Sequence, residues 1–297
     1  MKKVYASDDD MLAAAAAQSG TLYLVPTPIG NLGDITARAL DILRSVDMIA
    51  AEDTRHSAKL LRHFDIRTPT TPCHDHNEEQ AASSLVKKLT EGKSIALISD
   101  AGTPLLSDPG YRLIQMAIDA NVSVIALPGA NALLPALQLS GLPAHPFYFY
   151  GFLPSRSKAR TTVLGTLAAL DATLVFYEAP HRLAEMLGDA AEILGGNRSA
   201  AVVREISKKF EEVRRGTLQE LGQHYRQNDA KGEIVVTIGG SGGEQKWDEE
   251  TVADALAKAL RGGAALREAV AIIAAQSHWP KRDVYDMALQ HKQNEGQ

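Results

Sequence analysis

The sequence has one cysteine, few aromatic residues and no long hydrophobic run. Cys73 is the only cysteine among 297 residues, so the chain forms no internal disulfide and no cysteine zinc cluster, and a reducing cytoplasm suits it. No apolar stretch approaches the roughly 20 residues of a membrane helix, so we expect no membrane span. The net charge of −5 excludes a polycation that coats nucleic acid with its whole surface. Any RNA contact must therefore come from local basic patches.

Two nucleotide-binding motifs are also missing. The chain has no P-loop with its Gly-Lys-Ser/Thr ending, and no G-x-G-x-x-G follows its first expected strand. The second absence argues against a nicotinamide-dependent dehydrogenase on a doubly wound sheet. No cluster of His, Cys and Asp has zinc spacing. The nearest is "CHDHNEE" at 73–79, which we interpret as a polar loop, so we expect no metal site.

Strand and helix patterns alternate from residue 21 to residue 240, which predicts an α/β protein with a mostly parallel first sheet. Short apolar runs end in turns and are followed by amphipathic segments, the first of which we expect Asp34 to cap. Near residue 141 the composition changes, because "GLPAHPFYFYGFLPSRSKAR" contains three prolines and five aromatic residues. Beyond it we expect a second α/β domain, in which residues 211–227 are largely helical. The expected organisation is a flexible leader at 1–20, an N-terminal α/β domain at 21–141, a C-terminal α/β domain at 142–240 and a helical extension at 245–297.

Three expected strands of the first domain end in loops rich in proline and glycine, namely "PTPIGN" at 26–31, "SDAGTP" at 99–104 and "ALPGAN" at 126–131. Ligands of open α/β sheets bind at the carboxyl ends of the strands. Each loop also has a simpler interpretation as a tight turn, and for Asp100 the two interpretations have about equal weight from spacing alone.

Charged residues gather in "EDTRHS" at 52–57, where an expected strand becomes a helix. A solvated charge run is the simpler interpretation. Alternatively, Arg55, Lys59 and Arg62 share one helix face at positions i, i+4 and i+7 and grip phosphates. "PSRSKAR", with Arg156 and Lys158, and the lysine pair at 208–209 form two further basic patches.

The last 50 residues read as three short helices with no strand, which resembles a helix-turn-helix appendage. Lys281 and Arg282 open the final helix, where such a motif presents its reading end. An alternative interpretation of about equal weight is that these helices form a small bundle, which only caps the second domain or supports a dimer.

Eight motifs in order give the chain a family resemblance: "VPTPIGNLGDIT", "AEDTRHSAKLL", "LISDAGTPLLSDPG", "ALPGANAL", "FYGFLP", "YEAPHR", "VVREISKKFEE" and "GEIVVTIGG". Together they resemble the tetrapyrrole-methylase-like class of S-adenosylmethionine methyltransferases. More narrowly, they are similar to the branch that methylates a cytidine ribose 2′-oxygen in the decoding region of small-subunit ribosomal RNA. The resemblance covers residues 21–240, and the helical extension is similar to that of the same branch.

The resemblance implies S-adenosylmethionine as cofactor, bound in a cleft between the two domains, and small-subunit ribosomal RNA or the small subunit as substrate. A homodimer in the cytoplasm is also implied. The cofactor carries no phosphate, which explains why the strand-end loops need no lysine. Its ribose hydroxyls and ammonium suit carboxylates, and its adenine and carboxylate suit bare backbone groups.

The resemblance also assigns residues. The implied cofactor-binding residues are Pro28, Gly30, Asp100, Ala101, Gly102, Thr103, Pro104, Pro128, Gly129 and Tyr177. The candidate catalytic residues are Glu52, Asp53, Glu178, His181, Glu205 and Lys208. The candidate RNA-binding residues are Arg55, Lys59, Arg62, Arg156, Lys158, Lys281 and Arg282. For the second-domain candidates the competing interpretation is structural, since a paired Glu and Arg more often form a salt bridge and a lone His more often packs.

Other functions stay open at this point. An enzyme of the same fold could methylate a tetrapyrrole or a translation-factor side chain, and a non-enzymatic RNA-binding module is a third possibility. Binding of S-adenosylmethionine separates the methyltransferases from the RNA-binding module and from the dehydrogenase.

Overall fold

We describe the chain from a computed structural model that covers residues 17–74, 78–242, 249–262, 264–277 and 279–294. Most of the expected leader and the centre of the expected polar loop at 73–79 therefore lie outside the described residues. The last leader residues are hydrogen-bonded to the first domain: the Ala17 amide donates to Ser45 Oγ, and the Gly20 amide donates to the Gly92 carbonyl.

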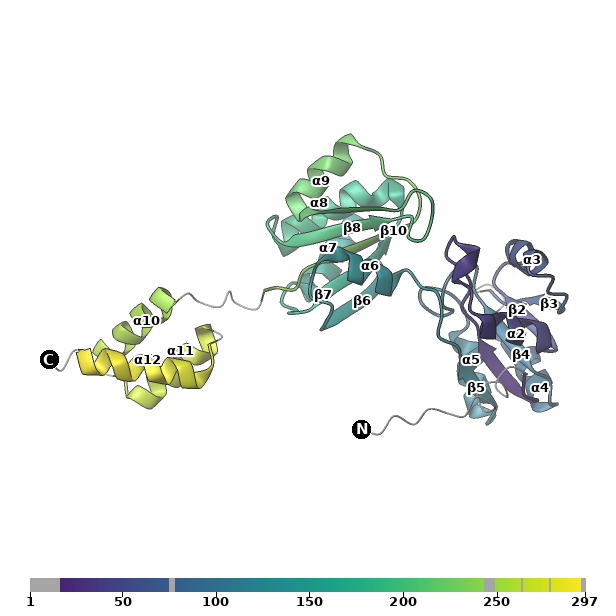
Figure 1. The fold of residues 1–297 in the computed structure, drawn as a ribbon, viewed down its shortest axis with the longest axis horizontal. Coiled ribbons are helices and arrows are strands. Elements are labelled where there is room, and N and C mark those ends of the chain that lie inside the picture. The colour runs from purple at the N-terminus through teal and green to yellow at the C-terminus, as the bar shows by residue number, and fades with distance from the viewer. Residues whose placement is uncertain (1–16, 75–77, 243–248, 263, 278, 295–297) are drawn as a thin grey trace.

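The first sheet has five strands in the order β3-β2-β4-β1-β5, and every adjacent pair is parallel. Its strands are β1 (Thr21–Leu24), β2 (Met48–Ala51), β3 (Thr70–Pro72), β4 (Ile95–Ile98) and β5 (Ser123–Ala126). The central strand β4 is buried along its whole length, as a continuous apolar run in a doubly covered parallel sheet must be. The expected mostly parallel first sheet is confirmed (Figure 1).

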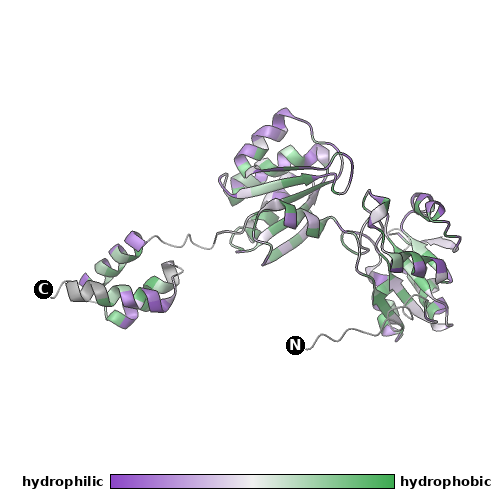
Figure 2. Cartoon of the chain, viewed as in Figure 1, coloured by the Kyte–Doolittle hydropathy of each residue, from purple (hydrophilic) through white to green (hydrophobic). Residues whose placement is uncertain are grey.

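Helices cover both faces of this sheet. They are α2 (Ala37–Ser45), α3 (Thr54–His63), α4 (Glu78–Thr90) and α5 (Tyr111–Asp119). Ile42 and Leu61 bring α2 and α3 onto one face, and Leu85 and Leu113 bring α4 and α5 onto the other. In Figure 2 the inner strands of both sheets are mainly green, which marks hydrophobic residues.

The cap of α2 differs from the expectation. Thr36 is the N-cap, and its hydroxyl accepts from the Ala39 amide at 3.1 Å. Asp34 instead ends a short 3₁₀ helix, η2 (Leu32–Asp34), so the prediction that it caps the helix was wrong. Its carboxylate accepts a hydrogen bond from a second-domain serine, Ser207.

The second sheet also has five strands, in the order β6-β7-β10-β8-β9. They are β6 (Phe147–Phe152), β7 (Thr173–Glu178), β8 (Ser199–Arg204), β9 (Glu212–Thr217) and β10 (Ile234–Ile238). Only the pair β6·β7 is parallel among these neighbours, and β10 runs antiparallel to both β7 and β8. The carboxyl end of β7 therefore lies beside the amino end of β10.

The prediction that residues 211–227 are largely helical was wrong for their first half. Residues 212–217 form the edge strand β9, which pairs with β8 along its whole length. A capping box then starts α9 (Leu218–Gln227), because Thr217 accepts from the Glu220 amide and Glu220 accepts from the Thr217 amide. The charged residues of β9 lie at the open edge of the sheet, where strands tolerate charge.

Three helices, α7 (Ser157–Leu167), α8 (Leu183–Leu194) and α9, cover one face of the second sheet. The other face is covered by α6 (Leu133–Ser140), which contacts β8, β9 and β10. The expected boundary at residue 141 thus follows a helix that packs on the second sheet.

The described part of the C-terminal segment forms three helices, α10 (Glu249–Arg261), α11 (Leu266–Ser277) and α12 (Lys281–Asn294). They pack on one another through a core of their own that includes Val252, Leu256, Val270 and Val284. Figure 1 shows this unit apart from both sheets. None of the described helices is both long and apolar enough to span a membrane.

A buried arginine joins α7 to α8. The side chain of Arg160 is 1% exposed, and its guanidinium lies 2.7 Å from the carboxylate of Asp189. It also donates to the Ser155 carbonyl, so it fixes the loop that follows β6. A charge buried to this extent is stable only while its partner is present.

We predict that Arg160→Ala lowers the free energy of unfolding by about 3–5 kcal/mol, because Asp189 is left without its counter-charge. Lys158→Ala, an exposed position on the same helix, should change it by less than about 0.5 kcal/mol. Urea unfolding followed by circular dichroism checks both values. Equal stabilities of the two variants would contradict the role of the pair.

Candidate active site

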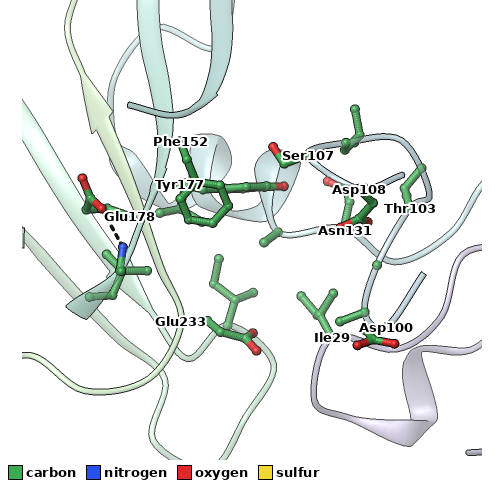
Figure 3. A pocket seen from close by; sticks show the side chains of 18 of the residues that line it. Ile29, Asp100, Thr103, Ser107, Asp108, Asn131, Phe152, Tyr177, Glu178 and Glu233 are labelled. Atoms are coloured by element: carbon green, nitrogen blue, oxygen red, sulfur yellow. Dashed lines mark hydrogen bonds between the residues drawn. The ribbon is translucent and has the colours of Figure 1, made fainter. Parts of the chain in front are cut away.

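A cavity of about 400 Å³ lies where the two sheet domains meet. The loops after β1, β2, β4 and β5 supply its first-domain wall, and the ends of β6, β7, β8 and β10 supply the second. Figure 3 shows the two walls facing each other, with Thr103, Ser107, Asp108 and Asn131 opposite Phe152 and Tyr177. The candidates Glu52, Asp100, Ala101, Gly102, Thr103, Tyr177 and Glu178 all line it.

Two carboxylates join the loops after β2 and β4. The Asp53 amide donates to Asp100 Oδ1 at 3.1 Å, and the Asp100 amide donates to a Glu52 carboxylate oxygen at 3.4 Å. Asp53 itself caps α3, because its carboxylate accepts from the Arg55 amide, and this bond lowers the pKa of Asp53 below its ordinary value. Asp53 does not line the cavity, whereas Glu52 and Asp100 do.

Hydrogen bonds to backbone groups hold together the three loops of the first-domain wall. Thr27 and Gly102 exchange two amide-to-carbonyl hydrogen bonds of 2.9 Å, which hold the loop after β1 against the loop after β4. Gly102 has a φ of +83°, a conformation that favours glycine. The Thr103 hydroxyl donates to the Ala130 carbonyl and ties in the loop after β5. The three proline- and glycine-rich loops thus form one surface.

The second-domain wall is aromatic. Tyr177 packs edge-on against Phe152, with ring centroids 5.6 Å apart. Burial, aided by the negative charge of Asp108, raises the pKa of Tyr177 to about 12. The phenol therefore stays neutral, and Figure 3 shows it reaching toward the side that carries Asp108 and Asn131. It can donate a hydrogen bond across the cleft.

Glu178 lines the cavity with its backbone, while its carboxylate points elsewhere. The side chains of β7 alternate, so Tyr177 faces the cleft and Glu178, which is 2% exposed, faces the helices on the other side. Its carboxylate accepts from the Ala179 amide at 2.7 Å and lies 3.2 Å from Arg182 Nε. Figure 3 shows this carboxylate directed away from Asp100, Asp108 and Asn131. Burial raises the pKa of Glu178, although the Ala179 amide and Arg182 oppose that shift.

Glu205 and Lys208 form a charge cluster with Glu233 beside the cavity. The Lys208 ammonium lies 2.9 Å from Glu205 and 3.1 Å from Glu233, and Glu233 lines the cavity. Burial alone would lower the pKa of Lys208, but the hydrogen bonds to both carboxylates outweigh it and raise that pKa. The bond from Lys208 lowers the pKa of Glu205. Both groups are therefore charged at neutral pH, and Lys208 cannot act as a base.

The same segment holds the two domains together. Ser207 Oγ donates to the carboxylate of Asp34, and the aliphatic chain of Lys208 lies against Gly30. A Cβ atom at Gly30 would lie 2.5 Å from carbons of Lys208, and Gly30 has a φ of +143°. The sequence suggested that Gly30 admits a ligand, whereas in the structure it admits this lysine.

The remaining candidates lie outside the lining. His181 is exposed in the 3₁₀ helix η3 (Pro180–Arg182). Gly129 packs against Pro26, so that the loops after β1 and β5 touch. The cofactor-binding and catalytic candidates that do not line the cavity are Pro28, Gly30, Asp53, Pro104, Pro128, Gly129, His181, Glu205 and Lys208. The RNA-binding candidates are all exposed: Arg55, Lys59, Arg62, Arg156, Lys158, Lys281 and Arg282.

Several lining residues were not among the candidates. Asp108 and Asn131 belong to "SDPG" and "PGAN", whose position after strands would have found them. Phe152 ends an edge strand that sequence reasoning did not predict. Glu233 precedes β10, and only the antiparallel pairing of β10 with β7 brings it to the cleft. Ser107, Leu106, Ile29, Ala132, Ala179, Pro180, Ile206, Gly232, Ile234 and Val235 complete the lining.

Within the described residues no group of three or more His, Cys, Asp or Glu side chains has the arrangement of a metal site.

We predict that Gly30→Ala destabilises the protein by about 1–3 kcal/mol, because alanine is strained at this φ and its methyl group meets Lys208. In a Lys208→Ala background the cost should fall, since the clash is then relieved. Gly165→Ala, where a Cβ meets nothing within 4 Å, serves as control. Unfolding free energies of the four-member cycle test this, and an unchanged cost would assign it to the backbone alone.

Comparison with known proteins agrees with this architecture. A model of the family "Tetrapyrrole (Corrin/Porphyrin) Methylases" matches residues 21–222. A Vibrio cholerae protein named ribosomal RNA small subunit methyltransferase I is 49% identical over 276 residues, which cover 91% of this chain and 94% of that protein. The Escherichia coli O157:H7 protein of the same name is 43% identical over 284 residues, 94% and 98% of the two chains.

Solved structures share the fold at low identity. Uroporphyrin-III C-methyltransferase from Thermus thermophilus superposes with a TM-score of 0.53 at 20% identity, covering 75% of this chain and 96% of that one. Diphthine synthase gives 0.58 at 15% identity, with 74% and 90% covered. The chain belongs to the tetrapyrrole (corrin/porphyrin) methylase family and, within it, to the family of the ribosomal RNA small subunit methyltransferase I proteins.

Proposed function

We propose that this chain is an S-adenosylmethionine-dependent methyltransferase that methylates the ribose 2′-oxygen of a cytidine in the decoding region of small-subunit ribosomal RNA. The observation that carries the proposal is the 43–49% identity, over nine-tenths of the chain, to proteins named ribosomal RNA small subunit methyltransferase I. The solved tetrapyrrole and diphthine enzymes share only the fold, and fold alone does not assign a substrate.

The cavity suits S-adenosylmethionine, which supplies an electrophilic methyl group when bound. Its volume of about 400 Å³ is in the range of small-molecule sites. None of the described residues that line it is Lys or Arg, so nothing there repels a sulfonium cation. Asp100 offers a carboxylate, and the exposed backbone at Ala101 and the amide of Asn131 offer neutral hydrogen-bonding groups.

The nucleophile also sets requirements. A ribose hydroxyl must be held about 3–3.5 Å from the methyl group and in line with the bond that breaks. It must also lose its proton to a positioned base. Asp100 and Asp108 present carboxylates to the cavity and suit that task better than Glu178, which is buried and ion-paired, or Glu233, which is paired with Lys208. The neutral Tyr177 phenol, on the opposite wall, can position the hydroxyl by a hydrogen bond.

Exposed basic residues suit the RNA backbone. Helix α3 starts next to the cavity, because Asp53, its N-cap, is bonded to Asp100. The side chains of Lys59 and Arg62 project from it into solvent. Phosphate contacts of this kind position a substrate without reading its sequence. Arg156, Lys158, Lys281 and Arg282 extend the proposed contact to the second domain and to α12.

The proposal includes a homodimer that works in the cytoplasm. The edge strand β6 exposes Phe147, Tyr148 and Tyr150, which are apolar enough to meet a second copy.

The function is tested with small subunits from cells that lack this protein. Wild-type chain and S-adenosylmethionine should restore a 2′-O-methyl stop in primer extension within the decoding region. Asp100→Ala should weaken S-adenosylmethionine binding about tenfold or more in calorimetry, because a charge-assisted contact is worth roughly 1.5–3 kcal/mol. Asp119→Ala, an exposed acid at the far end of α5, is the matched control. Methylation of a base, or none, would refute the assignment.

The exposed cations of α3 give a separate prediction. Lys59→Ala should weaken small-subunit RNA binding and reduce the slope of log affinity against log salt by about one unit, as loss of one phosphate contact does. Affinity for S-adenosylmethionine should stay unchanged. Lys87→Ala, also exposed but on α4 across the sheet, should leave the slope as it is. Identical slopes for the parent and Lys59→Ala would show that α3 does not touch RNA.

A further inference from the structure

Phe210 presents a large apolar side chain to solvent beside the cleft. It is 64% exposed and stands in the turn at residues 205–211, which joins β8 to β9. A single exposed apolar residue is ordinary by itself. Three features of this turn set Phe210 apart: the turn is fixed, it borders the cavity, and it carries an outward cation.

The turn is held rigidly by its own hydrogen bonds. The Lys208 amide donates to the Glu205 carbonyl at 3.0 Å, and the Glu211 amide donates to the Lys208 carbonyl at 3.2 Å. The Ser207 amide donates to the Glu211 carboxylate at 2.7 Å. Since the backbone on both sides of Phe210 is fixed in advance, a ligand that contacts the ring loses little conformational entropy in ordering it.

The turn also borders the cavity. Ile206 lines the cavity, and Lys208 is bonded to Glu233, which lines it as well. Ser207 bonds Asp34 of the first domain, so the turn bridges both walls. Phe210 belongs to this turn, so we expect a polymer with one unit in the cleft to pass close to it.

The two lysines of the turn, Lys208 and Lys209, lie in different surroundings. Lys208 is neutralised by Glu205 and Glu233 on the cavity side. Lys209 is exposed, and its ammonium lies over the Phe210 ring, 5.5 Å from the centroid. An exposed ring next to an exposed cation is the pairing that single-stranded nucleic acid recognises, with a base stacked on the ring and a phosphate beside the cation.

We propose that Phe210 is a stacking platform for an unpaired RNA base next to the methylated nucleotide, and that Lys209 contacts the adjoining phosphate. This inference rests on the proposed function. Because the ammonium covers one face of the ring, the base stacks on the opposite face. The platform fixes the register of the strand, so that the correct ribose enters the cleft.

The test compares Phe210→Ala, Phe210→Trp and Lys209→Ala with the parent chain on small subunits that lack the modification. Phe210→Ala should raise the KM for small subunits about 5- to 150-fold, the range that loss of one base–aromatic stack gives, with kcat less affected. Phe210→Trp should restore KM, because indole stacks as well. Lys209→Ala should reduce the slope of log affinity for small-subunit RNA against log salt concentration by about one unit, whereas Phe210→Ala should leave that slope unchanged. Ile118→Ala, which is 59% exposed at the far end of α5, is the control.

Three outcomes would overturn the platform: an unchanged KM for Phe210→Ala, a loss of S-adenosylmethionine affinity in that variant, or a change of its oligomeric state in sedimentation. The second would make the turn a support of the cofactor cleft, and the third would make Phe210 a subunit contact. If the parent chain binds S-adenosylmethionine but neither binds nor methylates small-subunit RNA, the proposed function fails and the platform fails with it. Normal parent activity with an unaffected Phe210→Ala overturns the platform alone.

Discussion

The cleft depends on the contact between the turn at 205–211 and the loop after β1. Ser207 and Asp34 form a hydrogen bond there, and the aliphatic chain of Lys208 fills the space that Gly30 leaves open. The loop after β1 is in turn bonded to the loop after β4 through Thr27 and Gly102. A shift of this contact therefore moves both walls of the cavity. The family motifs on either side of the cleft specify an interface between domains as much as they specify a ligand site.

This dependence explains why several charged candidates hold the structure together and do not face the ligand space. Glu178 is buried against Arg182, and Lys208 is shared by two carboxylates. Removing one partner of such a pair leaves an uncompensated charge, which costs more than the pair contributes. Loss of activity in Glu178 or Lys208 variants is thus expected from a displaced wall, even without a chemical role for either side chain.

The sequence predicts the first domain better than the second for physical reasons. A parallel sheet covered on both faces produces continuous apolar runs such as β4, and proline and glycine mark where its strands end. The edge strands β6 and β9 lack that pattern, because one exposes aromatic side chains and the other charged ones. Asp100 and its loop were predictable from position after a strand. The side to which Glu178 points could not be predicted, because it depends on which face of the sheet α7–α9 cover. The position of Glu233 at the cleft could not be predicted either, because it depends on the β7·β10 pairing.

The proposed RNA contacts divide into two kinds by their distance from the cavity. Lys59, Arg62 and the helices α10–α12 offer exposed cations on separate units, which suits phosphates that are far apart in a folded RNA. Such contacts raise affinity together, because binding at one unit raises the effective concentration of the next. They do not select a nucleotide. Selection requires a fixed group within a base or two of the reacting ribose. The proposed stacking on Phe210 meets that requirement, because hydrogen bonds within the 205–211 turn fix the backbone on both sides of this residue.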